Sequence, residues 1–290
     1  MGNFIGAIAG DILGSTYEWH NTKEYGIDWF RAGSKATDDS VLTCAVASWL
    51  MCDKEATNEV LAASLRGFAN AFPDAGYGSK FRKWLNQDND EPIGSYGNGS
   101  GMRCSAVGYF ARNYEECLEL AEKSAAVTHN HEEGIKGAKA ISLGVYLACC
   151  GYDKEDIKAG IERECGYNLN KSISDFVTMD DKGQVVWRAH KFDATCQTSV
   201  PEAIIAFLES TSFEDAIEKA CFIGGDTDTI ACMAGALAGA YYGVPQWIEE
   251  EVISILPEKL FDVVVEFETF IAKRNRKLLR DEGDRYEGDC

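Results

Sequence analysis

The sequence contains few basic residues. Its 290 residues include 28 lysines and arginines but 47 aspartates and glutamates, which gives a formal net charge of −19 at pH 7. A surface of this sign repels the phosphate backbone of nucleic acids and anionic lipids. We therefore expect neither a nucleic acid duplex nor a membrane as a partner. A ligand that carries phosphate groups would need cations between itself and the protein.

Cysteines spaced as Cys-x-x-Cys are also absent, although the chain has 11 cysteines. Their number is odd, and they are scattered from Cys44 to Cys290, several of them in apolar stretches. These features indicate reduced thiols in a protein of the cytoplasm. The first residues lack the basic region of a signal peptide, which leads to the same expectation for the compartment.

No proline- or serine-rich linker divides the chain, which predicts a single domain. We expect this domain to span 1–280 and to be followed by a solvated acidic tail over 281–290. One long uncharged run, 229–248, is rich in alanine and glycine and contains Pro245. We interpret the run as a buried helix and not as a membrane span.

Helical periodicity dominates the sequence. Apolar residues recur at steps of three and four in 60–72 and 260–271, which predicts two amphipathic helices. A serine followed three residues later by an acid predicts helix starts at Ser199 and Ser212. Further helices are expected around 38–52, 115–127, 132–150 and 201–210. The sequence therefore predicts an all-α fold.

The segment 165–198 does not follow this helical pattern. A turn signal at residues 180–183 separates two short apolar runs, at 176–177 and 185–187. This arrangement is typical of a small hairpin or a structured loop.

Glycines recur every four residues at two places. The first series is Gly2, Gly6, Gly10 and Gly14, and the second is Gly235, Gly239 and Gly243. On a helix such a series forms a ridge without side chains, which lets another backbone approach closely. The glycines alone indicate no more than the crowded centre of a helical bundle, but acidic residues lie beside both series.

Acidic residues also cluster at two expected helix starts. The first cluster is Thr-Asp-Asp at 37–39, and the second is Asp-Thr-Asp-Thr at 226–229. Either one alone is typical of a helix N-cap. Neighbouring acids cannot all be caps, however, and close carboxylates repel one another unless a cation neutralises them. Carboxylates and hydroxyls suit Mg²⁺ or Mn²⁺, and the two clusters together could hold two ions.

Three further segments carry candidate functional residues. The glycine-rich stretch 94–103 could form an anion-binding nest or a flexible surface loop, and it lacks the lysine of a Walker loop. His129 belongs to a His-x-His step, which leaves structural and ligand-binding roles open. Glu18, between Tyr17 and Trp19, is either an exposed residue at a helix end or an acid in a partly apolar pocket, where its pKa would rise.

Taken in this order, these segments resemble the ADP-ribosylglycohydrolase family. The likeness extends over about residues 4–248, and its paired metal motifs are highly specific. Residues 6–15 are similar to the family's opening motif, and 37–39 and 224–231 are similar to its two metal motifs. Residues 97–103 and 128–129 are similar to its middle motifs, and 199–203 to the segment that precedes the second metal motif.

The resemblance implies an all-α orthogonal bundle with two Mg²⁺ or Mn²⁺ ions in a central cleft. The implied reaction is hydrolysis at the distal ribose of an ADP-ribosylated protein or a small conjugate, which releases ADP-ribose. Glu18 and Asp39 would be catalytic. The metal ligands would be Thr37, Asp38, Asp39, Asp226, Asp228 and Thr229. The residues in contact with ADP-ribose would be Gly94, Ser95, Tyr96, Gly97, Asn98, Gly99 and His129.

The sequence leaves other functions open. Glu18 and the glycine-rich stretch look closer to the branch that acts on serine-linked and O-acetyl-ADP-ribose than to the arginine-linked branch. The segment 165–198 has no counterpart that we can place, and it is a candidate for the rim that selects the leaving group. A two-metal phosphoesterase and a non-catalytic ADP-ribose binder are the alternatives. A monomer is expected, although nothing in the sequence fixes the oligomeric state.

Overall fold

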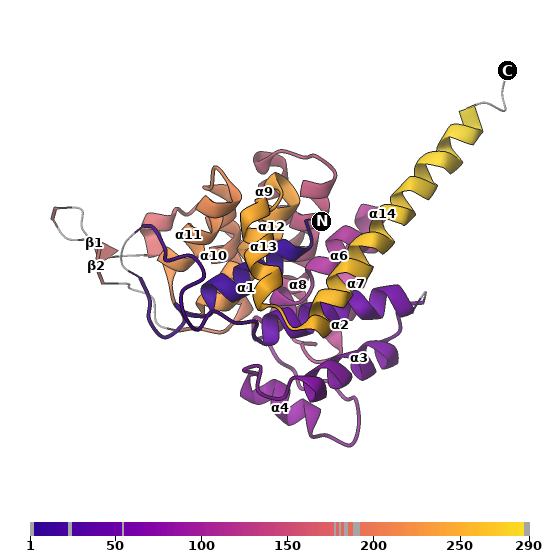
Figure 1. Ribbon diagram of the computed structural model, residues 1–290, viewed down its shortest axis with the longest axis horizontal. Helices are drawn as coiled ribbons and strands as arrows, with labels where there is room; N and C mark the ends of the chain where they lie inside the picture. Colours follow the sequence, from indigo (N-terminus) through magenta and orange to yellow (C-terminus); the bar gives the residue numbers. More distant parts are fainter. Residues whose placement is uncertain are drawn as a thin grey trace.

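The computed structural model describes residues 3–22, 25–53, 55–176, 178–179, 181–182, 185–187 and 192–286. Helices dominate these residues and pack around one apolar core, as predicted (Figure 1). The helices are α1 (Ile5–Gly14), α2 (Asp38–Cys52), α3 (Asn58–Ala71), α4 (Ser79–Leu85), α5 (Gly99–Met102), α6 (Ser105–Phe110), α7 (Tyr114–Ala126), α8 (Glu132–Cys149), α9 (Lys154–Cys165), α10 (Cys196–Leu208), α11 (Phe213–Ile223), α12 (Thr227–Tyr242), α13 (Gln246–Ile255) and α14 (Glu258–Tyr286), with a 3-10 helix η1 (Ile173–Phe176).

Helices α1 and α12 pack against each other in the middle of the molecule (Figure 1). The two glycine series form this contact: a Cβ added at Gly6 would lie 2.6 Å from the Gly235 carbonyl oxygen, and one added at Gly14 would lie 2.5 Å from that of Thr227. Gly2 lies outside the described residues. Because the end of α1 meets the start of α12, the helices are antiparallel, and the segment after α1 reaches residues 226–229.

Two of the predicted helix boundaries are wrong. Ser212 caps α11, as predicted, by accepting a hydrogen bond from the Asp215 N–H at 3.1 Å. Helix α10, in contrast, begins at Cys196 and not at Ser199, because backbone hydrogen bonds to the glycine-rich stretch order the chain earlier. The run 229–248 is not one helix either, since α12 ends at Tyr242 and is followed by Gly243, whose φ is +82°. A second helix, α13, begins after Pro245.

A small antiparallel hairpin interrupts the helices, as the sequence predicts for 165–198. Its strands are β1 (Thr178–Met179) and β2 (Val185–Trp187), and Thr178 pairs with Trp187. The first strand begins after the predicted 176–177, since Phe176 ends the 3-10 helix η1. Asp180 and Gly183 of the predicted turn lie outside the described residues.

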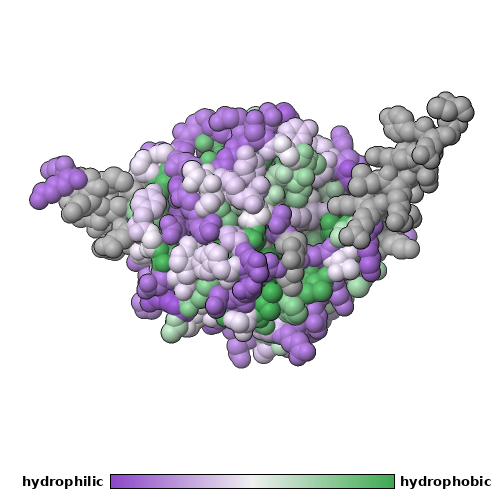
Figure 2. Space-filling view, turned by 45° about the horizontal axis from the view of Figure 1, so that its top comes forward, coloured by the Kyte–Doolittle hydropathy of each residue, from purple (hydrophilic) through white to green (hydrophobic). Residues whose placement is uncertain are grey.

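The hairpin and the end of α14 project from different sides of the helical body (Figure 1). The division of the chain at residue 280 into a domain and a tail stays a prediction. Figure 2 shows a face that is mostly hydrophilic, with hydrophobic side chains in separate groups. None of the described helices is long and apolar enough to cross a membrane. All ten cysteines in the described ranges are free, and seven of them are buried.

Candidate active site

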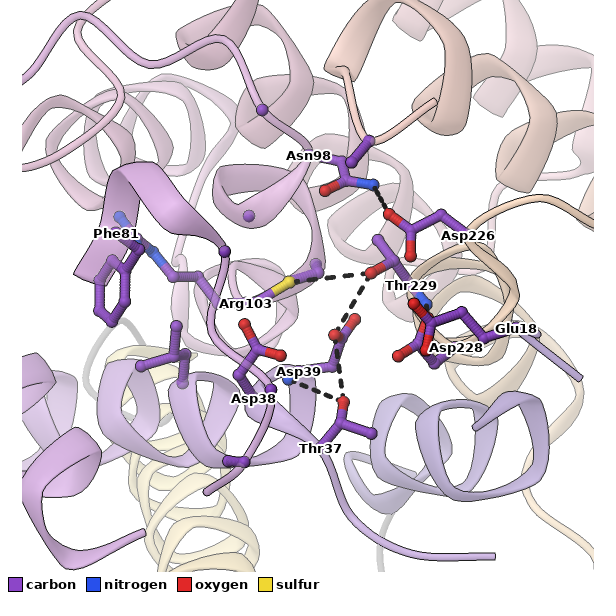
Figure 3. A pocket seen from close by; sticks show the side chains of 18 of the residues that line it. Glu18, Thr37, Asp38, Asp39, Phe81, Asn98, Arg103, Asp226, Asp228 and Thr229 are labelled. Carbon is purple, nitrogen blue, oxygen red and sulfur yellow. Dashed lines mark hydrogen bonds between the residues drawn. The ribbon is translucent and has the colours of Figure 1, made fainter. Parts of the chain in front are cut away.

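A cleft of about 730 Å³ opens where the segment after α1, the start of α2, the glycine-rich stretch and the start of α12 meet. The cleft is lined by most of the predicted site residues. They are Glu18, Thr37, Asp38, Asp39, Ser95, Tyr96, Gly97, Asn98, Gly99, His129, Asp226, Asp228 and Thr229. Gly94 is the exception, because it does not line the cleft and its N–H donates to Asn130 Oδ1 at 2.8 Å. The two acidic helix starts therefore converge in one place (Figure 3).

The start of α2 is held by Asp11, a residue that the sequence analysis did not select. Asp11 is fully buried in α1, and its Oδ2 accepts hydrogen bonds from the backbone N–H groups of Thr37 at 2.9 Å and Ser40 at 3.0 Å. Its Oδ1 accepts from the Thr37 hydroxyl at 2.7 Å. These bonds fix the first turn of α2 and aim Asp38 and Asp39 into the cleft (Figure 3). The signal in the sequence was a single charge within an apolar helix rich in glycine and alanine.

The start of α12 follows a sharp change in chain direction at Gly224 and Gly225, whose φ angles are +78° and +81°. Asp226 comes next, and its Oδ2 accepts a hydrogen bond from the Asn98 side chain at 2.7 Å. The Thr229 hydroxyl lies 3.3 Å from Asp39 Oδ2, so a hydrogen bond joins the starts of α2 and α12 directly (Figure 3).

The carboxylates of this cleft fit divalent cations. Oxygen atoms of Asp11, Asp39 and Asp228 lie within 4.8 Å of one another, and those of Glu18, Asp226 and Asp228 form a second such group. Asp39 Oδ1 is buried and has no hydrogen-bond partner among the described residues. A buried carboxylate oxygen without a donor is costly unless a cation meets it. The two groups share Asp228, so this residue is central to both.

The electrostatics of the cleft agree with a need for cations. Burial, followed by the nearby Asp228 carboxylate, raises the pKa of Glu18 to about 7. Burial and then neighbouring carboxylates also raise the pKa values of Asp38, Asp39 and Asp228 above the usual range for aspartate. The basic residues among the described cleft-lining side chains are Lys35, Lys80 and Arg103. Lys35 lowers the pKa of Glu18, but burial and the Asp228 carboxylate outweigh this effect.

Comparison with known proteins identifies the chain. The family model described as ADP-ribosylglycohydrolase matches residues 1–285. The chain belongs to this family. ADP-ribosylhydrolase ARH3 of Mus musculus is 30% identical to it over 314 aligned residues, which cover 84% of each protein. ARH3 of Homo sapiens is 31% identical, with 84% of this chain and 85% of the human protein covered.

More distant relatives support the same family. ADP-ribosylarginine hydrolase Tri1 of Pseudomonas putida is 26% identical, with 90% of this chain and 77% of that protein covered. A solved structure described as an ADP-ribosylglycohydrolase-related protein complex matches with a TM-score of 0.67 at 21% identity and covers 92% of this chain and 95% of its own. The likeness to this solved structure confirms the all-α fold. The chain is thus an ADP-ribosylglycohydrolase, an enzyme of the hydrolase class.

A buried arginine orients His129 in this ADP-ribosylglycohydrolase. Arg103 Nη2 donates to the Thr128 hydroxyl oxygen at 2.9 Å, and that oxygen lies 2.6 Å from His129 Nδ1. Because arginine only donates, the Thr128 hydroxyl hydrogen is free to be donated to Nδ1. The His129 proton is then carried on Nε2, the nitrogen that lies against Gly97 and Gly99. Burial, followed by the Arg103 charge, lowers the pKa of His129, which keeps the ring neutral.

In the Thr128→Val variant, we expect that His129 is no longer restricted to the tautomer protonated on Nε2. The valine has nearly the same shape but offers no hydroxyl to Nδ1, so His129 should populate both neutral forms. The ¹⁵N chemical shifts of its ring nitrogens would report the change. We also expect a loss of about 1–3 kcal/mol in the free energy of unfolding, because the buried Arg103 loses an acceptor. Thr128→Ser is the matched control and should keep the wild-type shifts; wild-type shifts in the valine variant would contradict the assignment.

The metal-free protein is expected to lose stability as the pH rises. Glu18 and the clustered aspartates have raised pKa values in the folded protein, so the folded state binds more protons than the unfolded one between about pH 4 and pH 7. Each such group is neutral in both states at low pH, and its burial becomes unfavourable once it ionises. Thermal unfolding in EDTA should therefore give a lower midpoint at about pH 8 than at about pH 5.5.

Two further measurements separate this effect from the general net charge. Mg²⁺ should raise the unfolding midpoint more at the higher pH, since it binds ionised carboxylates. The Asp38→Asn variant removes one acid whose pKa is raised to about 8, and it should flatten the pH dependence of the metal-free protein. An identical pH dependence in the wild type and this variant would show that the cluster does not cause the loss.

Proposed function

We propose that the protein is a metal-dependent ADP-ribosyl hydrolase that binds two Mg²⁺ or Mn²⁺ ions and cleaves the bond at the distal ribose of an ADP-ribosylated substrate. The observation that carries this proposal is the convergence of two acidic helix starts, 37–39 and 226–229, with Glu18 in one cleft. The ions would be held by Thr37, Asp38, Asp39, Asp226, Asp228 and Thr229. When bound, such ions hold ribose hydroxyls and balance the charge of the diphosphate.

The proposed role of Glu18 is proton transfer, with its carboxylate as the group that accepts or donates the proton. Its pKa of about 7 means that protonated and ionised forms are both available near neutral pH. An ionised Glu18 can accept a proton from water, and a protonated Glu18 can donate one to the leaving group. Either transfer assists cleavage at the anomeric carbon, where positive charge develops on the sugar ring.

The glycine-rich stretch is proposed to bind the diphosphate and the adjoining ribose. Gly97 and Gly99 bring backbone close to the cleft without side chains, and the His129 Nε2–H lies beside them. Lys80 Nζ lies 4.2 Å from the centre of the Tyr96 ring at the same wall, so a positive charge is available to a phosphate group. Gly94 has no place in this proposal, since it lies outside the cleft.

The proposal is tested by incubating the protein and Mg²⁺ with serine-linked and arginine-linked ADP-ribosylated peptides and measuring free ADP-ribose. From the sequence likeness we expect faster release from the serine-linked peptide. Release of AMP instead would indicate the two-metal phosphoesterase. Tight binding of ADP-ribose without release from either peptide would indicate a non-catalytic binder.

Replacing Glu18 with glutamine is expected to lower kcat by roughly 10²–10⁴-fold, because the amide cannot transfer the proton. The affinity for ADP-ribose, measured by titration calorimetry, should change little, since glutamine keeps the size of the side chain. The matched control is Glu132→Gln, which alters an exposed acid at the start of α8, outside the cleft. Wild-type kcat in Glu18→Gln would remove Glu18 from the proposed chemistry.

A further inference from the structure

Two aromatic side chains stack on each other at the mouth of the cleft. The ring centroids of Trp19 and Phe192 lie 5.5 Å apart with an angle of 13° between the planes. Both residues line the cleft, yet 73% of Trp19 and 49% of Phe192 remain exposed. An exposed aromatic pair beside a binding cleft is a surface that is well suited to contact a ligand.

The pair connects two walls of the cleft. Trp19 directly follows Glu18 in the chain, and both side chains line the cleft. On the other side, Phe192 precedes a segment that is fixed to the glycine-rich stretch: the Asn98 N–H donates to the Ala194 carbonyl at 2.9 Å. The Ser199 hydroxyl donates to the Asp193 carbonyl at 2.9 Å. The backbone directly after Phe192 is therefore fixed to the glycine-rich stretch, and the Phe192 ring stacks on the residue that follows Glu18.

The two ends of the cleft differ in chemistry. Phe81 and Glu18 lie at opposite sides of the pocket, with the aspartates between them (Figure 3). Lys80, in the first turn of α4, lies on the Phe81 side and supplies a positive charge, which suits a diphosphate. The Glu18 side offers carboxylates and the Trp19–Phe192 pair, which suits a ligand part without phosphate.

We propose that Trp19 and Phe192 form the subsite for the leaving group and select substrates whose ADP-ribose is attached to a polypeptide. This inference rests on the proposed function, which places the breaking bond beside Glu18. The leaving group then lies next to the exposed aromatic rings. An acetyl group is too small to cover two rings, whereas the peptide groups and side chains that flank a modified residue can pack on them.

The test compares two ligands that differ only by the leaving group. In a Glu18→Gln background, which prevents turnover, calorimetry gives the affinities for an ADP-ribosylated peptide and for free ADP-ribose. We expect the peptide conjugate to bind more tightly than free ADP-ribose. Adding Phe192→Ala should lower the affinity for the peptide conjugate about tenfold and leave the affinity for free ADP-ribose unchanged. Tyr152→Ala, at an aromatic residue that is 48% exposed and outside the cleft, should change neither affinity.

Turnover provides an independent measurement. With an otherwise unchanged enzyme, Phe192→Ala should raise KM for the ADP-ribosylated peptide about tenfold and affect kcat less. Trp19→Phe keeps an aromatic ring that can stack on Phe192, so it should raise KM much less than Phe192→Ala does.

Two results would overturn the inference. If Phe192→Ala lowers the affinity for both ligands equally, the aromatic pair binds ADP-ribose itself. If it lowers neither affinity, the pair contacts neither the ADP-ribose nor the leaving group. Failure of the proposed function is a separate result, because it is seen as an absence of ADP-ribose release by the wild-type protein. The calorimetric comparison decides the leaving-group subsite even in that case.

Discussion

Asp228→Asn is expected to abolish turnover and at the same time to stabilise the metal-free protein. Asp228 belongs to both groups of clustered carboxylates and is almost completely buried. The amide has nearly the same shape but cannot neutralise a divalent cation, so we expect kcat/KM to fall by roughly a hundredfold or more. The variant also removes a group whose burial is unfavourable when it is ionised and whose ionised form repels Asp226 and Asp11, which is why the metal-free protein should unfold at a higher temperature.

The measurements for this variant are ADP-ribose release and thermal unfolding with and without Mg²⁺. Wild-type protein should show a rise in its unfolding midpoint on addition of Mg²⁺, and the variant should show little or none. Asp156→Asn, at an exposed position in the first turn of α9, serves as the matched control and should behave as wild type in both assays. Retained turnover in Asp228→Asn would exclude this residue from the catalytic site.

Gly10→Ala is expected to be the most destabilising single-methyl substitution in the central helix pair. A Cβ at this position would lie 1.9 Å from the Ala231 carbonyl oxygen and 2.9 Å from the Cys232 Cα. Both are backbone atoms of α12, so relief requires the two helices to separate. We expect a loss of more than about 3 kcal/mol in the free energy of unfolding, which urea titration would measure.

Two other glycines make this prediction specific. Gly67, in α3, has nothing within 4 Å of an added Cβ, so Gly67→Ala should be neutral or stabilise by up to about 1 kcal/mol. Gly144→Ala would meet the end of the Leu237 side chain at 2.5 Å, and a side chain can move where backbone cannot. It should therefore cost less than Gly10→Ala. If Gly10→Ala does not fold, comparing its soluble yield with the yields of these two variants gives the order of destabilisation. Equal yields and stabilities of the three variants would refute the backbone clash.

The sequence was informative where function requires a local pattern. The acidic clusters at 37–39 and 226–229 were visible because both combine acids with threonines at a helix start, and neighbouring acids cannot all be caps. The helices at 60–72 and 260–271 were predictable from apolar steps of three and four, since each of them faces the core on one side. The glycine series were recognised as ridges, although their mutual contact is visible only in the structure.

Features that depend on distant segments could not be predicted. Ser199 looked like a helix cap, but its hydroxyl is used by Asn98 and by the Asp193 carbonyl, contacts that local sequence does not encode. Asp11 looked like part of a glycine ridge, although its partners are in α2. The stacking of Trp19 on Phe192 joins two segments of unrelated pattern, and nothing in either one indicates the other.

The antiparallel pairing of α1 with α12 also has a consequence for synthesis of the protein. Helix α1 leaves the ribosome early, but the backbone that fills its glycine ridge is translated more than 200 residues later. At usual elongation rates this delay is roughly ten seconds or more. During that time the glycine ridge of an apolar helix must stay unpaired, and the two acidic clusters cannot meet, although α2 is already available to Asp11. Assembly of the cleft between the starts of α2 and α12 is therefore a late event, dominated by contacts of large sequence separation.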